Sequence, residues 1–320
     1  MASLDVSSMA AARNPSKTAP PTPRRDGMHL IPATPIQYDL DLTNMHTFRD
    51  ITYKVSTSDH CARIAFNRPD VLHAFRPNTI NEFRRALELA SDDVRVAAIL
   101  FASEIDESLR TPAFCSGGDQ SVRSSAGGYD DGTEAVPRLR VLDLQVQMRR
   151  CPKPIVAVVR GYAIGGGHII HMLADLTLAG EDAVFGQTGP RMGSVDAGYG
   201  STHMARLVGQ KRAREMWFLC KFYGAREAKE MGLINDYFPN DRLEGEVGRW
   251  VRRIVMNSPT AIAVAKAAIN ADEDGPGAGV ALLGGHVTRL FYMSEEAKEG
   301  REAYLQGRPP MFRNVPTSRL

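Results

Sequence analysis

Two continuous apolar runs, each followed by a glycine-rich loop, constrain the fold of this 320-residue chain more than any other feature. Residues 97–101 and 154–159 consist of apolar residues, a pattern typical of strands in a sheet that is covered on both faces. Glycine-rich loops follow at 114–120 and 161–168, and a further short strand is predicted at 184–187. Because the chain then turns helical, we predict one α/β core followed by a helical C-terminal region.

The first 45 residues differ in kind from the rest, since they are rich in Ala, Ser, Pro and Arg and lack apolar periodicity. Such a composition buries too little surface to offset the entropy of ordering. We therefore expect 1–45 to be a disordered or targeting extension, 46–257 the core, and 258–320 the helical C-terminal region. Downstream of the extension, Asn78 is predicted to cap a helix whose apolar residues recur on one face.

Charge, cysteine usage and hydropathy narrow the class of protein. A net charge of +2 gives no reason to expect a nucleic-acid partner. The four cysteines form no CxxC pair, which favours a reduced intracellular setting. No apolar run approaches the roughly 18 residues that a membrane-spanning helix needs.

The two glycine-rich loops are the first candidate for chemistry. Glycine lets backbone N–H groups approach a ligand closely, and a helix N-terminus offers unpaired donors. Two such loops that converge would form an oxyanion hole from main-chain amides alone. Either loop by itself is equally consistent with a tight turn, and neither fits the phosphate-loop or dinucleotide-binding pattern.

As a pair, each after a buried strand, the loops resemble those of the crotonase superfamily over roughly residues 50–312. The resemblance implies an α/β spiral of ββα units that assembles as trimers or dimers of trimers. It also implies that the amides of Gly118 and Gly166 hold the enolate oxygen of a CoA thioester. Residues implied to contact the substrate are Arg76, Ser116, Gly117, Asp119, Gln120, Tyr162, Gly165, Thr188 and, near the C-terminus, Arg308.

Two positions argue against the commonest reaction of that superfamily. Its hydratases carry two glutamates as general acid and base, and the matching positions here are Ile169 and Gly189. Without either carboxylate, the addition of water across a double bond has no evident base.

Residues 116–120, 185–200, 217–220 and 290–293 resemble the naphthoate synthase family more specifically. That resemblance implies a lyase of phylloquinone or menaquinone biosynthesis, which closes the ring of o-succinylbenzoyl-CoA by an intramolecular Claisen condensation. In the branch with glycine at the position of Gly189, a bound hydrogencarbonate (bicarbonate) acts as the base. Gln187, Gly189 and Trp217 are implied to hold it, because each can donate a hydrogen bond to an anion.

Further roles follow from the same resemblance. Asp196, paired with Ser194, is implied to protonate the aromatic carboxyl group under attack. Tyr129 and Tyr292 are implied to bind substrate oxygens and to relay protons. The alternatives are another acyl-CoA activity of the superfamily, such as thioester hydrolysis or decarboxylation, and a non-catalytic CoA-binding protein.

Two remaining features have simpler interpretations. His168 and His171 stand three residues apart with no further ligand cluster beside them, so we expect helix packing and no metal site. The sequence ends in Ser318-Arg319-Leu320, which resembles a peroxisomal import tripeptide. This resemblance implies a peroxisomal location and recognition by an import receptor, with the plastid as the alternative because of the basic N-terminus.

Overall fold

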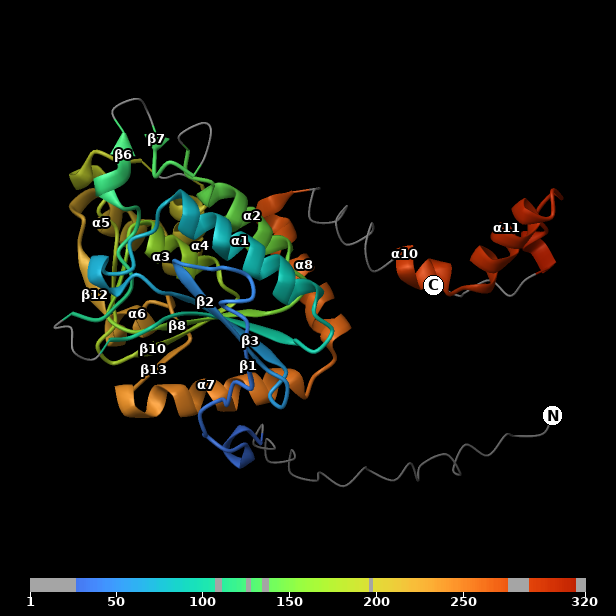
Figure 1. Cartoon of the computed structure of the whole chain (residues 1–320), viewed down its shortest axis with the longest axis horizontal. Helices are drawn as coiled ribbons and strands as arrows, with labels where there is room; N and C mark the ends of the chain where they lie inside the picture. The colour runs from blue at the N-terminus through green and yellow to red at the C-terminus, as the bar shows by residue number, and fades with distance from the viewer. Residues whose placement is uncertain are drawn as a thin grey trace, which may run out of the picture.

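Two sheets organise the body of the molecule (Figure 1). The computed structural model describes residues 27–106, 111–124, 128–133, 138–195, 198–275 and 288–314. The larger sheet has seven strands in the order β1-β2-β3-β4-β8-β10-β13, and the smaller has four in the order β12-β11-β9-β5. The larger comprises β1 (Leu40–Asp41), β2 (Ile51–Ser56), β3 (Cys61–Phe66), β4 (Ala98–Ser103), β8 (Ile155–Val159), β10 (Leu176–Gly180) and β13 (Asp236–Phe238). The smaller comprises β5 (Ala113–Cys115), β9 (Tyr162–Ile164), β11 (Val184–Gly186) and β12 (Phe222–Gly224).

Three pairs of strands that follow one another in the chain are divided between the two sheets. The pairs β4/β5, β8/β9 and β10/β11 each contribute their first strand to the large sheet and their second to the small sheet. Within the large sheet β4, β8 and β10 are parallel neighbours, and within the small sheet β5, β9 and β11 are. A helix follows the first two pairs, α2 (Val141–Arg150) after β5 and α3 (Gly166–Leu173) after β9. The predicted α/β spiral of ββα units is therefore confirmed, and the apolar runs form β4 and β8.

Helices cover the sheets and fill the C-terminal half. They are α1 (Pro77–Asp92), α4 (Gly200–Val208), α5 (Gln210–Leu219), α6 (Ala225–Glu230), α7 (Asn240–Val255), α8 (Pro259–Asp274), α10 (Thr288–Tyr292) and α11 (Glu295–Leu305). The prediction that Asn78 caps α1 was wrong, because the cap is Arg76, two residues earlier, and the helix begins at Pro77. Proline is well suited to the first helical position, where its missing N–H has no intrahelical partner to lose. None of the helices within the described ranges is long and apolar enough to cross a membrane.

Strand β8 shows how both faces of the large sheet are buried. Ile155, Ala157 and Val159 belong to the core on the side of α1 to α3, while Val156 and Val158 join the core under α7. Alternate side chains of a strand point to opposite faces, so a strand covered twice must be apolar throughout.

The N-terminal segment before β1 packs against α7. Ile36 is buried, and the Arg252 Nη1 donates a hydrogen bond to the Thr34 carbonyl oxygen at 3.0 Å. A Cβ at Gly248 would stand 2.2 Å from that same oxygen, so the glycine makes room for the passing backbone. The boundary predicted at residue 45 is therefore too late in the chain. Residues 31–41 belong to the fold, and 1–26 lie outside the described residues.

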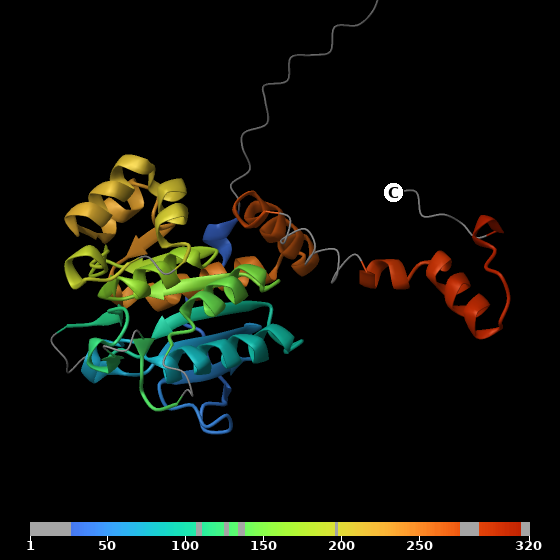
Figure 2. The same cartoon turned by 90° about the horizontal axis from the view of Figure 1, so that it is seen from above.

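The C-terminal helices α10 and α11 lie away from the body in both views (Figures 1 and 2). Their apolar side chains are open to solvent: Leu290, Phe291 and Met293 are 61%, 50% and 69% exposed. We call residues 288–314 the C-terminal arm. The terminal tripeptide Ser318-Arg319-Leu320 is outside the described residues.

Candidate active site

Three parallel neighbours in the small sheet end at the same edge. β5 is followed by Ser116–Gly118, β9 by Gly165–Gly166, and β11 by Gln187–Gly189. Because β5 pairs with β9 and β9 with β11 in parallel, the segments after their carboxyl ends lie side by side. All three segments line one cavity of about 300 Å³. The predicted convergence of the two glycine-rich loops is therefore present, with a third segment beside them.

The first two segments approach each other within van der Waals contact. A Cβ at Gly117 would stand 3.2 Å from the Ile164 carbonyl oxygen and 3.3 Å from the Gly166 nitrogen. Gly117 also has a φ of 97°, a conformation that residues with side chains rarely adopt. Phe75 fixes the loop from its other side, because its N–H donates to the Gly117 oxygen at 2.8 Å. Only glycine satisfies both conditions at position 117.

The amides of Gly118 and Gly166 are free to bind a ligand. Neither donates to an acceptor within the described part of the chain, and Gly166 begins α3, where helical N–H groups are unpaired. A Cβ at Gly118 would meet the Tyr129 hydroxyl at 2.6 Å, and one at Gly166 would meet the Phe75 ring at 2.4 Å. Two unpaired donors thus face one cavity from positions where a side chain does not fit. This arrangement can stabilise an oxyanion.

The three residues implied to hold hydrogencarbonate line the same cavity. Gln187 is 1% exposed, and its Nε2 donates to the Gly165 oxygen at 3.3 Å. The Trp217 indole nitrogen is buried and has no partner among the described residues. A Cβ at Gly189 would stand 3.2 Å from the Trp217 ring. An unpartnered indole N–H beside a residue without a side chain fits a small anion.

The lining of this cavity carries no ionisable acid or base other than the Tyr129 phenol, as far as the chain is described. Ile169 and Gly189, where hydratases would carry glutamates, are both in the lining. The described part of the wall therefore combines unpaired donors with no carboxylate, and it is suited to a ligand with oxygen acceptors.

Tyr129 enters the cavity from β7 (Gly128–Tyr129), which pairs with β6 (Arg123–Ser124). The Gln120 side-chain nitrogen donates to the Gly118 oxygen at 2.9 Å and contacts the Tyr129 hydroxyl at 3.1 Å. Arg123, which sequence reasoning missed, donates to the Gly193 carbonyl oxygen at 2.7 Å. The β6–β7 hairpin is thereby connected both to the first loop and to the segment after β11.

Several predicted substrate-binding residues do not line the cavity. Arg76 makes a bidentate ion pair with Asp50, both N–O distances being 2.7 Å. Asp119 accepts hydrogen bonds from Arg68 and Ser121. Burial opposes ionisation of Asp119, but these hydrogen bonds prevail and lower its pKa. Tyr162 belongs to β9 and is also absent from the lining.

Other predicted residues divide between the cavity, the arm and the undescribed segments. Ser116, Gly117, Gly165, Thr188 and Ser194 line the cavity. Tyr292 and Arg308 belong to the C-terminal arm, where Tyr292 is 70% exposed and Arg308 pairs with Glu299. Asp196 lies outside the described residues, so its predicted role has no structural account.

His168 and His171 form a fully buried pair, in keeping with the packing role expected for them. The His168 Nδ1 lies 3.1 Å from the His171 Nε2, and the His171 Nδ1 lies 3.3 Å from the Thr177 hydroxyl. Because that hydroxyl donates to the His171 carbonyl oxygen, it accepts from the His171 Nδ1–H. Burial lowers the pKa of His168 to about 3 and that of His171 well below its usual value. Both rings are therefore neutral near pH 7.

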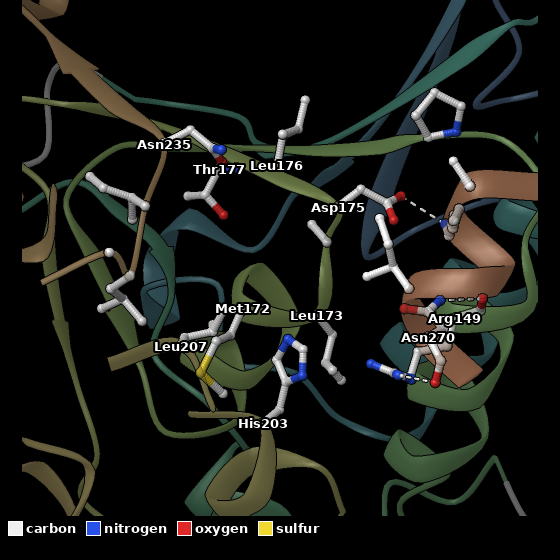
Figure 3. Close-up of a pocket in the computed structure, with 18 of the residues that line it drawn as sticks. Arg149, Met172, Leu173, Asp175, Leu176, Thr177, His203, Leu207, Asn235 and Asn270 are labelled. Atoms are coloured by element: carbon white, nitrogen blue, oxygen red, sulfur yellow. Dashed lines mark hydrogen bonds and ion pairs between the residues drawn. The ribbon is translucent and has the colours of Figure 1, made fainter. Parts of the chain in front are cut away.

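A second cavity, of about 490 Å³, lies between the start of β10 and the helices α4, α7 and α8 (Figure 3). Its charged groups are all paired: Lys266 with Asp175 at 2.7 Å, and Arg149 with Asp274 at 2.7 Å. Sequence reasoning did not predict this cavity. Although it is the larger of the two, its charged side chains already have partners, so the smaller cavity is the better candidate for catalysis.

Gln145 is the polar lining residue that sequence reasoning missed. It is fully buried in α2 and belongs to the wall of the smaller cavity. A signal was available in the sequence, because Val141, Leu144 and Met148 have the spacing of a buried helix face and Gln145 falls beside them. A polar residue at such a position requires a hydrogen-bonding partner or a function.

This chain is similar to proteins of the enoyl-CoA hydratase/isomerase family in sequence and in structure. A family model described as enoyl-CoA hydratase/isomerase matches residues 56–315. An enoyl-CoA hydratase from Mycobacterium avium subsp. paratuberculosis is 29% identical over 71% of this chain and 86% of its own, with a TM-score of 0.61. An enoyl-CoA hydratase/isomerase from Xanthobacter autotrophicus is 28% identical over 73% of this chain and 84% of its own, with a TM-score of 0.62. An enoyl-CoA hydratase subunit from Geobacillus kaustophilus is 26% identical over 82% and 98%, with a TM-score of 0.62.

Proposed function

This chain belongs to the enoyl-CoA hydratase/isomerase family, and from that premise we propose that it is a naphthoate synthase. The reaction would convert o-succinylbenzoyl-CoA into 1,4-dihydroxy-2-naphthoyl-CoA by an intramolecular Claisen condensation. One observation carries the proposal: the described cavity wall offers unpaired N–H donors and no carboxylate. A hydratase needs a carboxylate to activate water, whereas ring closure needs an enolate and a base of any origin.

Gly118 and Gly166 would act on the thioester. Their amides would donate to the thioester oxygen, which gains negative charge when the neighbouring carbon loses a proton. Donors already oriented by the backbone need no rearrangement at that moment, and one such donor is worth about 100-fold or more in rate. Tyr129 covers Gly118 and would keep water away from the enolate.

Gln187, Gly189 and Trp217 would hold hydrogencarbonate beside this pair of amides. When bound there, hydrogencarbonate supplies the base that accepts the α-proton of the thioester. Trp217 would donate its unpartnered indole N–H, and the absence of a side chain at Gly189 would leave the space. Burial of Gln187 and of the Trp217 indole nitrogen strengthens their hydrogen bonds to a negative charge.

The second half of the reaction joins two parts of one substrate. The carbon α to the thioester would bond to the aromatic carboxyl carbon, and one carboxyl oxygen would leave as water. Ser194 lines the cavity and would orient that carboxyl group together with Asp196. An aspartic acid kept protonated by burial would suit proton delivery to the oxygen that leaves.

Tyr292 would come from a second copy of the chain. Its place on the exposed C-terminal arm, away from the body in both views, supports this part of the proposal (Figures 1 and 2). The arm's exposed Leu290, Phe291 and Met293 would be buried in the same contact. The assembly proposed is a trimer or a dimer of trimers.

The decisive experiment is an assay of the full chain with o-succinylbenzoyl-CoA in degassed buffer, with and without added hydrogencarbonate. We expect the naphthoyl thioester to form and its rate to rise with hydrogencarbonate until it saturates. Product that forms equally fast without the anion would remove the assigned base but leave the reaction. Release of free CoA without ring closure would instead indicate a thioester hydrolase, and no reaction at all would refute the proposal.

A further inference from the structure

The Gln145 side chain has one end in use and the other free. Its Oε1 accepts a hydrogen bond from the Tyr199 N–H at 3.2 Å. Its Nε2 is buried and has no partner in the part of the chain that is described. Burying an amide donor without an acceptor is unfavourable, and native proteins rarely leave one so unless a ligand supplies the acceptor.

The orientation of this amide is fixed by its surroundings. Only the oxygen can accept from the Tyr199 N–H, so the nitrogen must be the free end. A Cβ at Gly198 would stand 2.0 Å from the Gln145 Oε1, and the glycine therefore makes the close approach possible. The Tyr199 ring is itself held under the Arg149 guanidinium, 4.9 Å from its centre.

A second glutamine in the same helix has its donor in use, while its buried Oε1 has no partner among the described residues. Gln147 donates its Nε2 to the Arg84 carbonyl oxygen at 2.9 Å and does not line the cavity. Its donor is satisfied within the protein, whereas that of Gln145 is not. The two residues thus form a matched pair of one residue type in one helix.

Apolar side chains line the cavity together with Gln145. Val141 lies one turn earlier on the same face of α2, and Leu139 and Ile169 line the cavity as well. A buried donor in the lining selects ligands that carry an acceptor at that point, because a ligand without one leaves the donor unpaired.

From this geometry we propose that Gln145 is a specificity residue that donates a hydrogen bond from Nε2 to a second oxygen of the acyl group. The acceptor would be a ketone or carboxylate oxygen, distinct from the thioester oxygen held by Gly118 and Gly166. This inference rests on the proposed function in one respect, namely that the thioester oxygen binds at those two amides. It identifies the substrate class as oxygenated acyl-CoA esters.

The test measures the dissociation constants of three CoA esters by calorimetry. The parent probe is 4-phenylbutanoyl-CoA, the second adds a ketone at C4, and the third adds a carboxylate at the ortho position of the ring. We expect the wild type to bind at least one oxygenated ester more tightly than the parent. Gln145→Glu keeps the acceptor for Tyr199 but loses the donor. It should raise the dissociation constant of that ester about 10-fold or more, and that of the parent less than about twofold.

Gln145→Met serves as the second variant, because it removes the donor without adding charge, and Gln147→Met is the control. Equal weakening of all three esters in the Gln145 variants, or no weakening at all, would overturn the inference. Because binding is measured without turnover, failure of this inference can be distinguished from failure of the proposed reaction. Selective loss in an enzyme that closes no ring would refute only the proposed reaction, while ring closure with unselective Gln145 variants would refute only the role of Gln145.

Discussion

The phenolic oxygen of Tyr129 lies against the α-carbon of Gly118, so close that a Cβ on residue 118 would stand 2.6 Å from it. The residue that offers a free amide to the ligand is thus covered by a tyrosine from a separate hairpin. Gln120 connects the two, since its side-chain nitrogen reaches both the Gly118 oxygen and the Tyr129 hydroxyl. The first loop and the β6–β7 hairpin therefore act as one unit.

The contact between Gly118 and Tyr129 predicts coupled effects of substitution. Gly118→Ala should lower kcat about 100-fold, because the added methyl group displaces the ring and moves the amide. In a Tyr129→Ala background the same change should cost clearly less, with a coupling energy above about 0.5 kcal/mol in a double-mutant cycle. Gly224→Ala is the control, because a Cβ there has no atom within 4 Å. Strictly additive effects would show that the two residues act independently.

The unpartnered indole of Trp217 predicts a change in hydrogencarbonate dependence. Trp217→Phe keeps most of the ring but removes the N–H, so the concentration needed for half-maximal rate should rise roughly 10-fold. Trp250→Phe is the control, since Trp250 packs against the core under α7, away from the cavity. The measurement is a titration of the initial rate with hydrogencarbonate. An unchanged half-maximal concentration in Trp217→Phe would exclude this residue from the anion site.

Gly189→Asp should give activity that no longer depends on added hydrogencarbonate. The backbone there has φ −45° and ψ −58°, which any residue can adopt. A Cβ would stand 3.2 Å from both the Ser194 oxygen and the Trp217 ring, so the carboxylate fits after a small shift of its neighbours. We expect a lower maximal rate together with a flat response to the anion. A variant that still requires hydrogencarbonate would contradict the placement of the base next to residue 189.

The exposed arm predicts complementation between subunits. Tyr292→Phe and Gly166→Ala should each be nearly inactive as homo-oligomers. If Tyr292 serves the cavity of another copy, coexpressed chains that assort at random should recover roughly a quarter of wild-type activity. Activity of the purified mixed oligomer is the readout, with light scattering to confirm its size. No recovery in a verified mixed oligomer would mean that Tyr292 serves only its own body or none.

The buried histidine pair predicts a loss of stability in mild acid. Burial lowers the pKa of His168 to about 3 from the usual 6.5, so the unfolded chain binds a proton that the folded chain does not. The free energy of unfolding should therefore be largest above pH 6.5 and should fall by about 1.4 kcal/mol per pH unit for each such histidine as the pH drops below it. In urea titrations between about pH 7.5 and 5, the free energy of unfolding should depend less steeply on pH in His168→Leu than in the wild type. His29→Gln, on the exposed η1 (Met28–Leu30), should match the wild type, and an unaltered slope in His168→Leu would contradict the assignment.

The sequence alone determined the central strands and the glycine-rich loops that follow them. Continuous apolar runs are typical of strands that are buried on both faces, and β4 and β8 are such strands. Glycines at 117, 118, 165 and 166 were recognisable because backbone amides need them near a ligand. The absence of glutamate at positions 169 and 189 could also be recognised from the sequence, because the residue type at a single position does not depend on the fold.

Only the tertiary structure decided which groups meet. The parallel pairing of β5, β9 and β11 brings three distant segments to one edge, and pairing between strands is a non-local property. The tertiary structure also showed that Arg76 and Asp119 are engaged in ion pairs, that residues 31–34 contact α7, and that Tyr292 stands on an exposed arm. Gln145 is the sharpest case: the sequence shows a glutamine on a buried helix face, but only its contact with Tyr199 reveals which end of the amide is free. One physical reason applies to all of these contacts. The type of a residue determines which hydrogen bonds and ion pairs it can form, and the fold determines which partners are within reach.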